Sequence, residues 1–393
     1  MLRAGQNRSG SPIRIGLDAR IVKPTLSGLG RYASELVTEL TSMDVPGVEW
    51  VIIKLPSMAD TALASPGSRA TEVVIGGELD LLENLVRARE VDALKLDLYH
   101  SLHHFLPPKI RTRRVVITVH DLMWVNHADL AYYGALGAVR GVGLSVYGKS
   151  TMQYALRRSD AVVTNSEATR QAVLEHYDFV SPENITATPL AVRPHRFPKR
   201  GGPERGGPEP QAPYFFCLGN TRPYKNVKAV MRAFATLSAT EPAVRLAVAG
   251  RGDGRTLLEK MARSLGVSDR VDFLGMVEDS EIVNHFHQAR GLIFPSKIEG
   301  FGLPVLEAMH AGCPVLVSDI AVFDEIVADA GIRVPAESDE DIVAGMRRLL
   351  HDTELRTRLR LKAWERAERF TWRRCAETTL GAYDALLDRM PLD

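Results

Sequence analysis

Two glutamates flank a glycine-rich turn in the run EGFGLPVLE, eight positions apart. Glu299 lies in the turn, and Glu307 lies on a helix expected to open at Pro304, since proline suits a first helical turn. Gly300 and Gly302 let the backbone approach a ligand, and the N–H groups at a helix start bind phosphate. The pattern predicts an anion site whose two carboxylates contact different parts of one ligand. Two solvated glutamates beside an ordinary turn are the alternative.

Two cations form a second candidate site in the run LGNTRPYKNVKAV. Arg222 and Lys225 lie three positions apart in a loop expected between a strand and a helix. A guanidinium and an ammonium group in one loop can bind a diphosphate through charge-assisted hydrogen bonds. Taken alone, the same pattern describes two exposed loop cations. The prediction of a diphosphate site therefore depends on the neighbouring glutamate motif.

The N-terminal half contains a glycine pair and a histidine at the end of a strand. Gly28 and Gly30, with Ala33, fit the G-x-G-x-x-A dinucleotide fingerprint. They stand about ten residues past the preceding strand, and the next strand lacks the acidic residue that binds a ribose.

His120 and Asp121 end the expected strand RRVVITVHD. His120 is a candidate ligand contact, with a satisfied strand-end histidine as the alternative, and Asp121 could orient its ring or contact an acceptor.

Three histidines in the run YHSLHH suggest a metal cluster, which their surroundings argue against. His100, His103 and His104 have no carboxylate or cysteine at ligand spacing, so no metal site is predicted. His103 and His104 are instead expected near an acceptor. Gly250 and Arg251, in the run VAGRGDG after another expected strand, are interpreted as part of the loop near a nucleotide base.

Short apolar runs alternate with amphipathic stretches along the chain, which predicts doubly wound α/β domains. A first domain over 11–195 has expected strands at 13–18, 49–55, 71–76, 97–101, 113–121 and 160–166. Its expected helices are 30–43, 78–90 and 166–177, the last with Ser166 as N-cap. Residues 196–213, rich in proline, glycine and charge, are predicted to be a linker.

A second domain over 214–374 repeats this alternation. Its expected strands are 214–220, 244–250, 270–275, 291–296 and 314–319. The expected helices between and after them are 226–238, 254–266, 280–290, 304–312, 339–352, 354–370 and 375–390. Two such domains predict a ligand cleft at the carboxyl ends of their strands.

The composition excludes several classes of protein. The 393 residues carry 49 Lys or Arg and 48 Asp or Glu, so the basic excess of a nucleic-acid-binding protein is absent. Three scattered cysteines indicate a reducing compartment rather than a disulfide framework (Cys217, Cys313 and Cys375). No run approaches the roughly 18 apolar residues of a membrane span, and no apolar run follows the N-terminal arginines. We expect a cytoplasmic protein with a short disordered N-terminal tail. The basic run 109–114 is either a solvated loop or a contact with anionic lipid.

The segment 295–319 resembles the Glu–seven-residues–Glu motif of the retaining GT-B glycosyltransferases of group 1 (family 4). The similarity extends through GFGLP, EAM and GCPV. It implies two Rossmann-like domains facing across a cleft, with the helix 375–390 packing back on the first domain. It also implies that Glu299 contacts hydroxyls of the transferred sugar and that Glu307 binds the ribose. The backbone expected to line sugar and phosphate is that of Gly300, Phe301, Gly302 and Leu303.

The same resemblance implies the remaining roles. Arg222 and Lys225 would bind the donor diphosphate, the Gly28–Gly30 loop would approach it, and His120 would pack against the donor sugar with its backbone carbonyl near the anomeric carbon. No metal or other cofactor is expected, because these cations and the helix start neutralise the leaving group. The acceptor hydroxyl would attack from the same face of the sugar and lose its proton to the departing phosphate. No covalent glutamate intermediate is implied.

The runs YHSLHHFLPP, TVHDLMW and NSEATR are most similar to mannosyltransferase-type members that assemble bacterial surface polysaccharides. They imply GDP-mannose or a related GDP-sugar as donor, with a UDP-sugar as the alternative, and a saccharide or lipid-linked oligosaccharide as acceptor. Two other classes stay open. A Rossmann oxidoreductase would use Gly28 and Gly30 but leave Glu299 and Lys225 without a role. A nucleotide-sugar-binding protein would keep the diphosphate site without catalysis.

Overall fold

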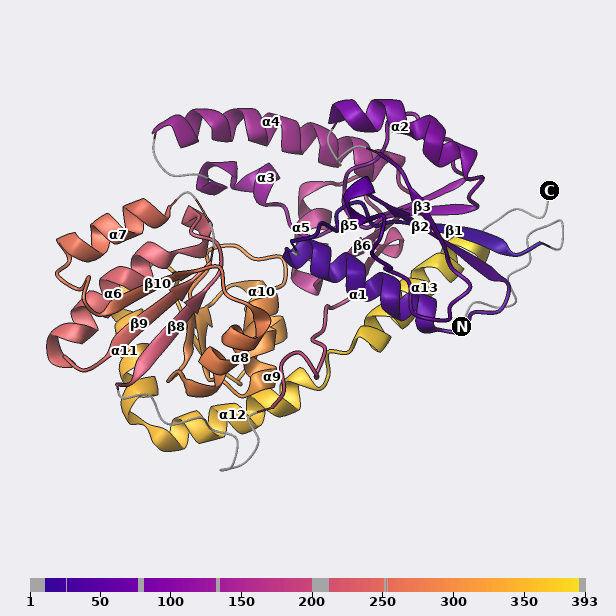
Figure 1. Cartoon of the computed structure of the whole chain (residues 1–393). Helices are drawn as coiled ribbons and strands as arrows, with labels where there is room; N and C mark the ends of the chain where they lie inside the picture. The colour runs from indigo at the N-terminus through magenta and orange to yellow at the C-terminus, as the bar shows by residue number, and fades with distance from the viewer. Residues whose placement is uncertain are drawn as a thin grey trace. The chain divides into compact units, whose positions relative to one another are not determined.

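The computed structural model describes residues 11–25, 27–76, 81–131, 135–199, 212–250, 252 and 254–388. The chain divides into two compact units, each built on its own sheet (Figure 1). The first unit comprises Met1–Val125, Val146–Leu190 and Trp372–Asp393, and the second comprises Asn126–Ser145 and Ala191–Thr371.

The first unit contains a seven-stranded parallel sheet in the order β3-β2-β1-β4-β5-β6-β7. Its strands are β1 (Ile13–Asp18), β2 (Val48–Lys54), β3 (Thr71–Val74), β4 (Leu98–Ser101), β5 (Arg114–Val119), β6 (Ala161–Thr164) and β7 (Ile185–Ala187). Every position of β4 and β6 is buried, as expected for parallel strands covered on both faces. The strand order reverses between β1 and β4, and ligands of such sheets bind at the carboxyl ends of strands beside a reversal.

Helices connect these strands. They are α1 (Gly28–Ser42), η1 (Pro56–Met58), α2 (Leu81–Ala93), α3 (Met123–Asn126), η2 (Ala128–Ala131), α4 (Ala135–Arg158), α5 (Glu167–His176) and η3 (Pro182–Asn184). A further helix, α13 (Trp372–Asp388), joins the first unit after the chain has passed through the second, and packs on α1, β6 and β7. Its residue Cys375 directs Sγ at the carbonyl of Thr188, 3.7 Å away.

The second unit contains a six-stranded parallel sheet in the order β10-β9-β8-β11-β12-β13. Its strands are β8 (Tyr214–Leu218), β9 (Arg245–Ala249), β10 (Val271–Gly275), β11 (Leu292–Phe294), β12 (Val315–Ser318) and β13 (Ile332–Val334). Its helices are η4 (Pro223–Lys225), α6 (Val227–Thr240), α7 (Arg255–Ser264), α8 (Asp279–Gln288), α9 (Leu303–Ala311), α10 (Ala321–Ile326), α11 (Asp339–His351) and α12 (Thr353–Ala367). Here the strand order reverses between β8 and β11.

The prediction of two doubly wound α/β units is confirmed, and every strand expected from sequence is present. The strands and α-helices that the sequence did not predict are β7, β13, α3, α10 and the 24-residue α4. Glycines recur through α4 and obscure its helical pattern, because glycine disfavours helices. Gly28 and Gly30 do not form the predicted loop. They lie in the first turn of α1, where Ser27 is the N-cap and its side chain accepts a hydrogen bond from the Gly30 amide.

The start of the predicted linker packs on the second unit. Phe197 is buried, and its carbonyl lies 2.6 Å from Nδ1 of His310. Lys199 pairs with Glu368 at 2.5 Å. The rest of the linker prediction (200–211) lies outside the described residues, as does most of the predicted N-terminal tail.

Candidate functional site

Two loops meet at the point where the strand order of the second unit reverses. One follows β8 and contains Arg222 and Lys225, and the other follows β11 and contains Glu299. The Lys297 amide donates to the carbonyl of Tyr224 at 2.8 Å. Nδ2 of Asn226 donates to the carbonyl of Pro295 at 3.0 Å. These hydrogen bonds hold the two loops side by side at the edge where ligands bind to sheets of this kind.

Lys225 and Glu299 form an ion pair between the two loops. Lys225 Nζ lies 2.5 Å from Glu299 Oε1, and the two side chains are 12% and 10% exposed. The same ammonium lies 4.8 Å from the ring centroid of Phe294, the last residue of β11. Sequence analysis selected both residues for different parts of a ligand but did not predict that they pair. The ammonium and the carboxylate are therefore positioned together, and both lie close to solvent.

Arg222 lies at the start of η4, partly exposed, beside this pair in the chain. Its backbone amide donates to Oδ1 of Asn220 at 3.1 Å, and Nδ2 of Asn220 donates to the hydroxyl of Tyr224 at 2.6 Å. These bonds fix the backbone of the loop through a side chain that the sequence analysis did not select. Asn220 is thus a positioning residue for the loop that holds both cations.

Two glycines bring the ends of β8 and β9 into contact. Gly219 and Gly250 have φ angles of 143° and 137°, which side chains rarely permit. A Cβ on Gly250 would lie 1.6 Å from the carbonyl oxygen of Gly219, so only glycine fits there. Gly250 is therefore placed next to the cation-bearing loop, and its predicted position near a nucleotide base stays a prediction. Arg251 lies outside the described residues.

The helix α9 begins at the end of the second loop. Gly302 is its N-cap, with a φ of 98°, and a Cβ there would lie 2.7 Å from Cε1 of Phe323. Leu303 and Pro304 occupy the first helical positions, so the helix opens one residue earlier than predicted. Gly300 and Phe301 are buried in the preceding turn, and Glu307 is buried one turn into the helix. The positive end of the helix dipole therefore lies next to Glu299.

In the first unit, His120 is buried directly after β5. Its Nε2 donates to the carbonyl of Leu102 at 3.0 Å, which leaves Nδ1 as the nitrogen with the lone pair. Burial lowers the pKa of His120 to about 4, against the raising effect of that hydrogen bond. The ring of Tyr32, on α1, packs nearly perpendicular to the imidazole, with 4.9 Å between the ring centroids. His120 is thus a neutral histidine held in one tautomer near the start of α1, and Thr169 Oγ1 donates to its carbonyl at 3.4 Å.

The three candidate acceptor residues, His103, His104 and Asp121, lie near His120 in the chain or in space. The rings of His103 and His104 lie tilted to each other with their centroids 4.1 Å apart, and the ring centroid of His103 lies 5.7 Å from that of His120. Burial lowers the pKa of His104 to about 3 and that of His103 well below its usual value. These two residues therefore share one cluster with His120. Asp121 accepts a hydrogen bond from the Met123 amide at 2.9 Å, and its predicted role beside the His120 ring or an acceptor stays a prediction.

His100 is separate from that cluster in its bonding. Its Nδ1 lies 2.5 Å from the hydroxyl of Tyr383 on α13, and its Nε2 lies 2.9 Å from Oγ1 of Thr118. Thr118 in turn contacts the hydroxyl of Tyr32 at 2.9 Å. Both ring nitrogens of His100 are used in this buried chain. Among the described residues, no group of three His, Cys, Asp or Glu side chains is placed to hold a metal ion.

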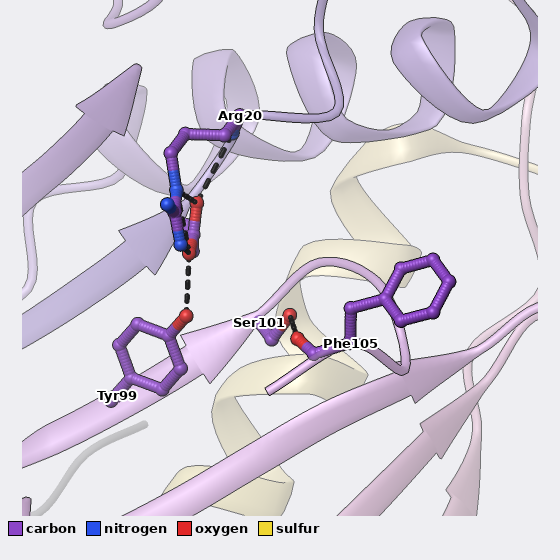
Figure 2. A network of polar contacts seen from close by, with 5 residues as sticks. Arg20, Tyr99, Ser101 and Phe105 are labelled. Atoms are coloured by element: carbon purple, nitrogen blue, oxygen red, sulfur yellow. Dashed lines mark hydrogen bonds and ion pairs between the residues drawn. The ribbon is translucent and has the colours of Figure 1, made fainter. Parts of the chain in front are cut away.

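Sequence analysis missed a buried ion pair at the carboxyl end of β1, shown in Figure 2. The guanidinium of Arg20 donates to both carboxylate oxygens of Asp18, at 2.9 and 2.6 Å, and both side chains are fully buried. The hydroxyl of Tyr99 donates to Asp18 at 2.5 Å. The run LDAR, with an acid and a base directly after a strand, was the available signal. Nearby, Ser101 donates to the carbonyl of Phe105 at 2.8 Å (Figure 2).

No helix within the described part of the chain is long and apolar enough to cross a membrane.

Comparison with known families accounts for both units. Residues 26–196 match the family described as Glycosyltransferase Family 4, and residues 203–366 match Glycosyl transferases group 1. The chain is 25% identical over 384 residues to O-antigen chain mannosyltransferase B of Escherichia coli, covering 93% of this chain and 98% of that protein. It is 30% identical over 245 residues to D-inositol 3-phosphate glycosyltransferase of Stackebrandtia nassauensis, covering 59% of this chain and 55% of that one.

Solved structures show the same fold at low identity. Sucrose-phosphate synthase from Thermosynechococcus elongatus superposes with a TM-score of 0.78 at 19% identity, covering 96% of this chain and all of that one. WaaG, a glycosyltransferase involved in lipopolysaccharide biosynthesis, superposes with a TM-score of 0.70 at 18% identity, covering 93% of this chain and 98% of that one.

Proposed function

Because this chain belongs to the group-1 glycosyltransferases with the GT-B fold, we propose that it transfers mannose from GDP-mannose to a saccharide or lipid-linked oligosaccharide, with retention of configuration and without a metal. The observation that carries the proposal is the ion pair between Lys225 and Glu299, positioned beside the start of α9. This site combines a cation for a diphosphate, a carboxylate for sugar hydroxyls and a helix N-terminus for the departing charge.

The leaving group is stabilised by groups of the second unit. Arg222 and Lys225 bind the two phosphates of the donor, and the start of α9 adds the positive end of its dipole. As the sugar gains oxocarbenium character, negative charge grows on the diphosphate, and fixed donors stabilise it more than they stabilise the intact donor. The acceptor hydroxyl attacks from the same face and gives its proton to the departing phosphate. Glu307 binds the ribose.

The roles toward the sugar are assigned to Glu299 and His120. Glu299 accepts hydrogen bonds from its hydroxyls, which requires the carboxylate to leave Lys225 when the diphosphate arrives. His120 packs against the donor sugar as a neutral imidazole, since burial keeps its pKa near 4. A neutral ring adds no positive charge beside a developing cation at the anomeric carbon.

The identity of the donor rests on the relatives. The full-length match is to an O-antigen chain mannosyltransferase, and a second O-antigen chain mannosyltransferase, of Salmonella typhimurium, is 27% identical over 240 residues. These names support mannose as the sugar and a surface polysaccharide as the product. A UDP-sugar is the alternative donor within the same fold.

Thermal melting of the full chain with GDP, UDP, ADP or NADH, each with and without EDTA, tests the proposal. A ligand at 100 times its dissociation constant stabilises the protein by about 2.7 kcal/mol. We expect a GDP-dependent shift that persists in EDTA. A shift with UDP alone would change the donor but keep the reaction class, and a shift with NADH alone would overturn the proposal.

Two variants test for catalysis rather than binding. Glu299→Ala and His120→Ala are expected to lose mannosyl transfer without losing nucleotide affinity, measured by product formation and by calorimetry with GDP. Unchanged turnover in both variants would reject the site assignment.

A further inference from the structure

A surface of the first unit is strongly basic although the whole chain is nearly neutral. The segments 107–114 and 146–158 contain 4 + 3 = 7 Lys or Arg residues and no Asp or Glu. The rest of the chain then has 49 − 7 = 42 basic residues against 48 acidic ones, so it is net acidic. The positive charge is therefore concentrated in these two segments.

The two segments are neighbours in space. The Lys109 amide donates to the hydroxyl of Tyr154 on α4 at 3.3 Å. Nη2 of Arg158, at the end of α4, donates to the carbonyls of Ile110 at 2.9 Å and Thr112 at 3.3 Å. The loop before β5 consequently lies along the last turns of α4, which belong to the first unit; the helix is labelled in Figure 1. The cations of both segments form one surface.

The last turns of α4 have a buried face and an exposed face. A Cβ on Gly148 would lie 2.8 Å from Cβ of Trp124, and Met152 is buried on the same side. The exposed side carries two large apolar side chains, Val146 at 62% and Tyr154 at 38% exposure. Exposed cations flank them on the helix and on the adjoining loop: Lys149, Arg157, Lys109, Arg111 and Arg113.

Two acidic residues adjoin this surface, and both are hydrogen-bonded within the protein. Asp92 accepts a hydrogen bond from the Arg111 amide at 2.9 Å. Asp160 pairs with Arg114 at 3.1 Å and accepts from the Val115 amide at 2.8 Å. Arg157 lies 4.1 Å over the ring of Phe179, which does not cancel its charge. The surface therefore presents cations and apolar side chains to solvent.

We propose that this basic surface binds an anionic lipid bilayer. Lysine and arginine near an anionic membrane each contribute about fivefold to binding, and valine and tyrosine side chains can enter the interfacial region. A nucleic acid would use the cations but not the apolar pair. The surface adjoins the amino end of β5, whereas His120 follows its carboxyl end, so docking leaves the His120 edge of the sheet uncovered. The proposal is independent of which sugar is transferred.

Sedimentation of the full chain with vesicles of phosphatidylglycerol or of phosphatidylcholine tests it. We expect binding to the anionic vesicles only, weakening as salt increases because exposed charges are screened. Lys109→Gln/Arg111→Gln/Arg113→Gln should weaken this binding by about 100-fold. A matched triple neutralisation of exposed cations on α7 and α11 of the second unit, Lys260→Gln/Arg263→Gln/Arg347→Gln, should bind like the wild type.

A further variant separates insertion from charge attraction. Val146→Ser keeps every charge and should weaken vesicle binding several-fold, with an unchanged melting temperature. Equal binding to neutral vesicles, equal loss in both triple variants, or preferential binding to duplex DNA would overturn the proposal. Transfer to a water-soluble acceptor should be unchanged in the first triple variant, which distinguishes a lost membrane contact from a damaged active site.

Discussion

Lys225 and Glu299 form an ion pair in which Nζ and Oε1 are 2.5 Å apart. A donor that binds both residues must therefore break this pair and take the place of the partner of each. Glu299→Gln removes the competing carboxylate and leaves the ammonium available to a diphosphate. We expect GDP to bind about threefold to tenfold more tightly, since weakly exposed charge pairs are worth of the order of 1 kcal/mol, while transfer falls at least 100-fold. Calorimetry and initial rates measure the two effects. The control is Glu337→Gln, which breaks the exposed ion pair of Glu337 with Lys297, a residue of the Glu299 loop. This variant should change neither the affinity for GDP nor the rate of transfer. Weaker GDP binding in Glu299→Gln would contradict the exchange.

The buried pair of Asp18 and Arg20 should be costly to break. Burial alone would lower the pKa of Arg20, but the attraction and hydrogen bonds of Asp18 raise it, so the guanidinium stays charged. Asp18→Asn leaves that charge buried without a counterion, and we expect a loss of about 3–5 kcal/mol in the free energy of unfolding. Glu49→Gln removes the surface pair with Arg14 and should cost less than about 1 kcal/mol. Urea denaturation measures the free energy of unfolding of both variants. Equal losses in Asp18→Asn and Glu49→Gln would contradict the prediction that the buried pair costs more to break than the surface pair.

Buried histidines should make the first unit sensitive to mild acid. Burial lowers the pKa values of His100 and His104 to about 3 and that of His120 to about 4, well below those of unfolded histidines. Between pH 6.5 and 4 the unfolded chain therefore binds more protons than the native one. Stability should be constant above this window and fall within it, by about 1.4 kcal/mol per pH unit for each histidine.

Urea midpoints at pH 7, 6 and 5 measure the slope. His104→Asn should flatten it, whereas the exposed His176→Asn should not, and a pH-independent midpoint would exclude the effect.

Alanine substitutions at Gly250 and Gly28 should distinguish a glycine that packing requires from one whose substitution the fold tolerates. At Gly250 a Cβ would overlap the carbonyl of Gly219, so Gly250→Ala must displace the loop that bears Arg222 and Lys225. We expect it to weaken GDP binding at least tenfold and to lower the melting temperature. At Gly28 a Cβ meets nothing within 4 Å. Gly28→Ala should therefore melt like the wild type. Any loss of donor affinity there would report contact with the ligand, and a destabilised Gly28→Ala would mean that the geometry of the α1 start is wrong.

How far the sequence could predict the fold depended on local signals. Short apolar strands alternating with amphipathic helices are visible without any tertiary information, which is why both sheets could be predicted. α4 could not, because its glycines weaken the helical pattern and its buried side fits around Trp124, a contact that the sequence does not show. β13 has three residues, too few for a period to be recognised.

The candidate site was predictable residue by residue but not as an arrangement. Glu299 and Lys225 are 74 positions apart, and only the strand order of the second unit brings them together. The sequence left open whether Asp121 orients the His120 ring or contacts an acceptor, and both roles stay predictions beside the hydrogen bond that its carboxylate accepts from the Met123 amide. The pairing of Asp18 with Arg20 needed knowledge that their neighbourhood is fully buried, which two polar residues separated by one alanine do not reveal in a sequence.

The position of α13 has a consequence for how the protein is made. A ribosome synthesises the whole second unit before residues 372–388, yet Tyr383 of this helix completes the buried hydrogen-bond chain of His100 in the first unit. During translation the second unit can finish folding while the first still exposes the apolar sides of α1, β6 and β7. The half of the protein that is synthesised first is thus the half that matures last, and until then it is the part most open to chaperones and proteases.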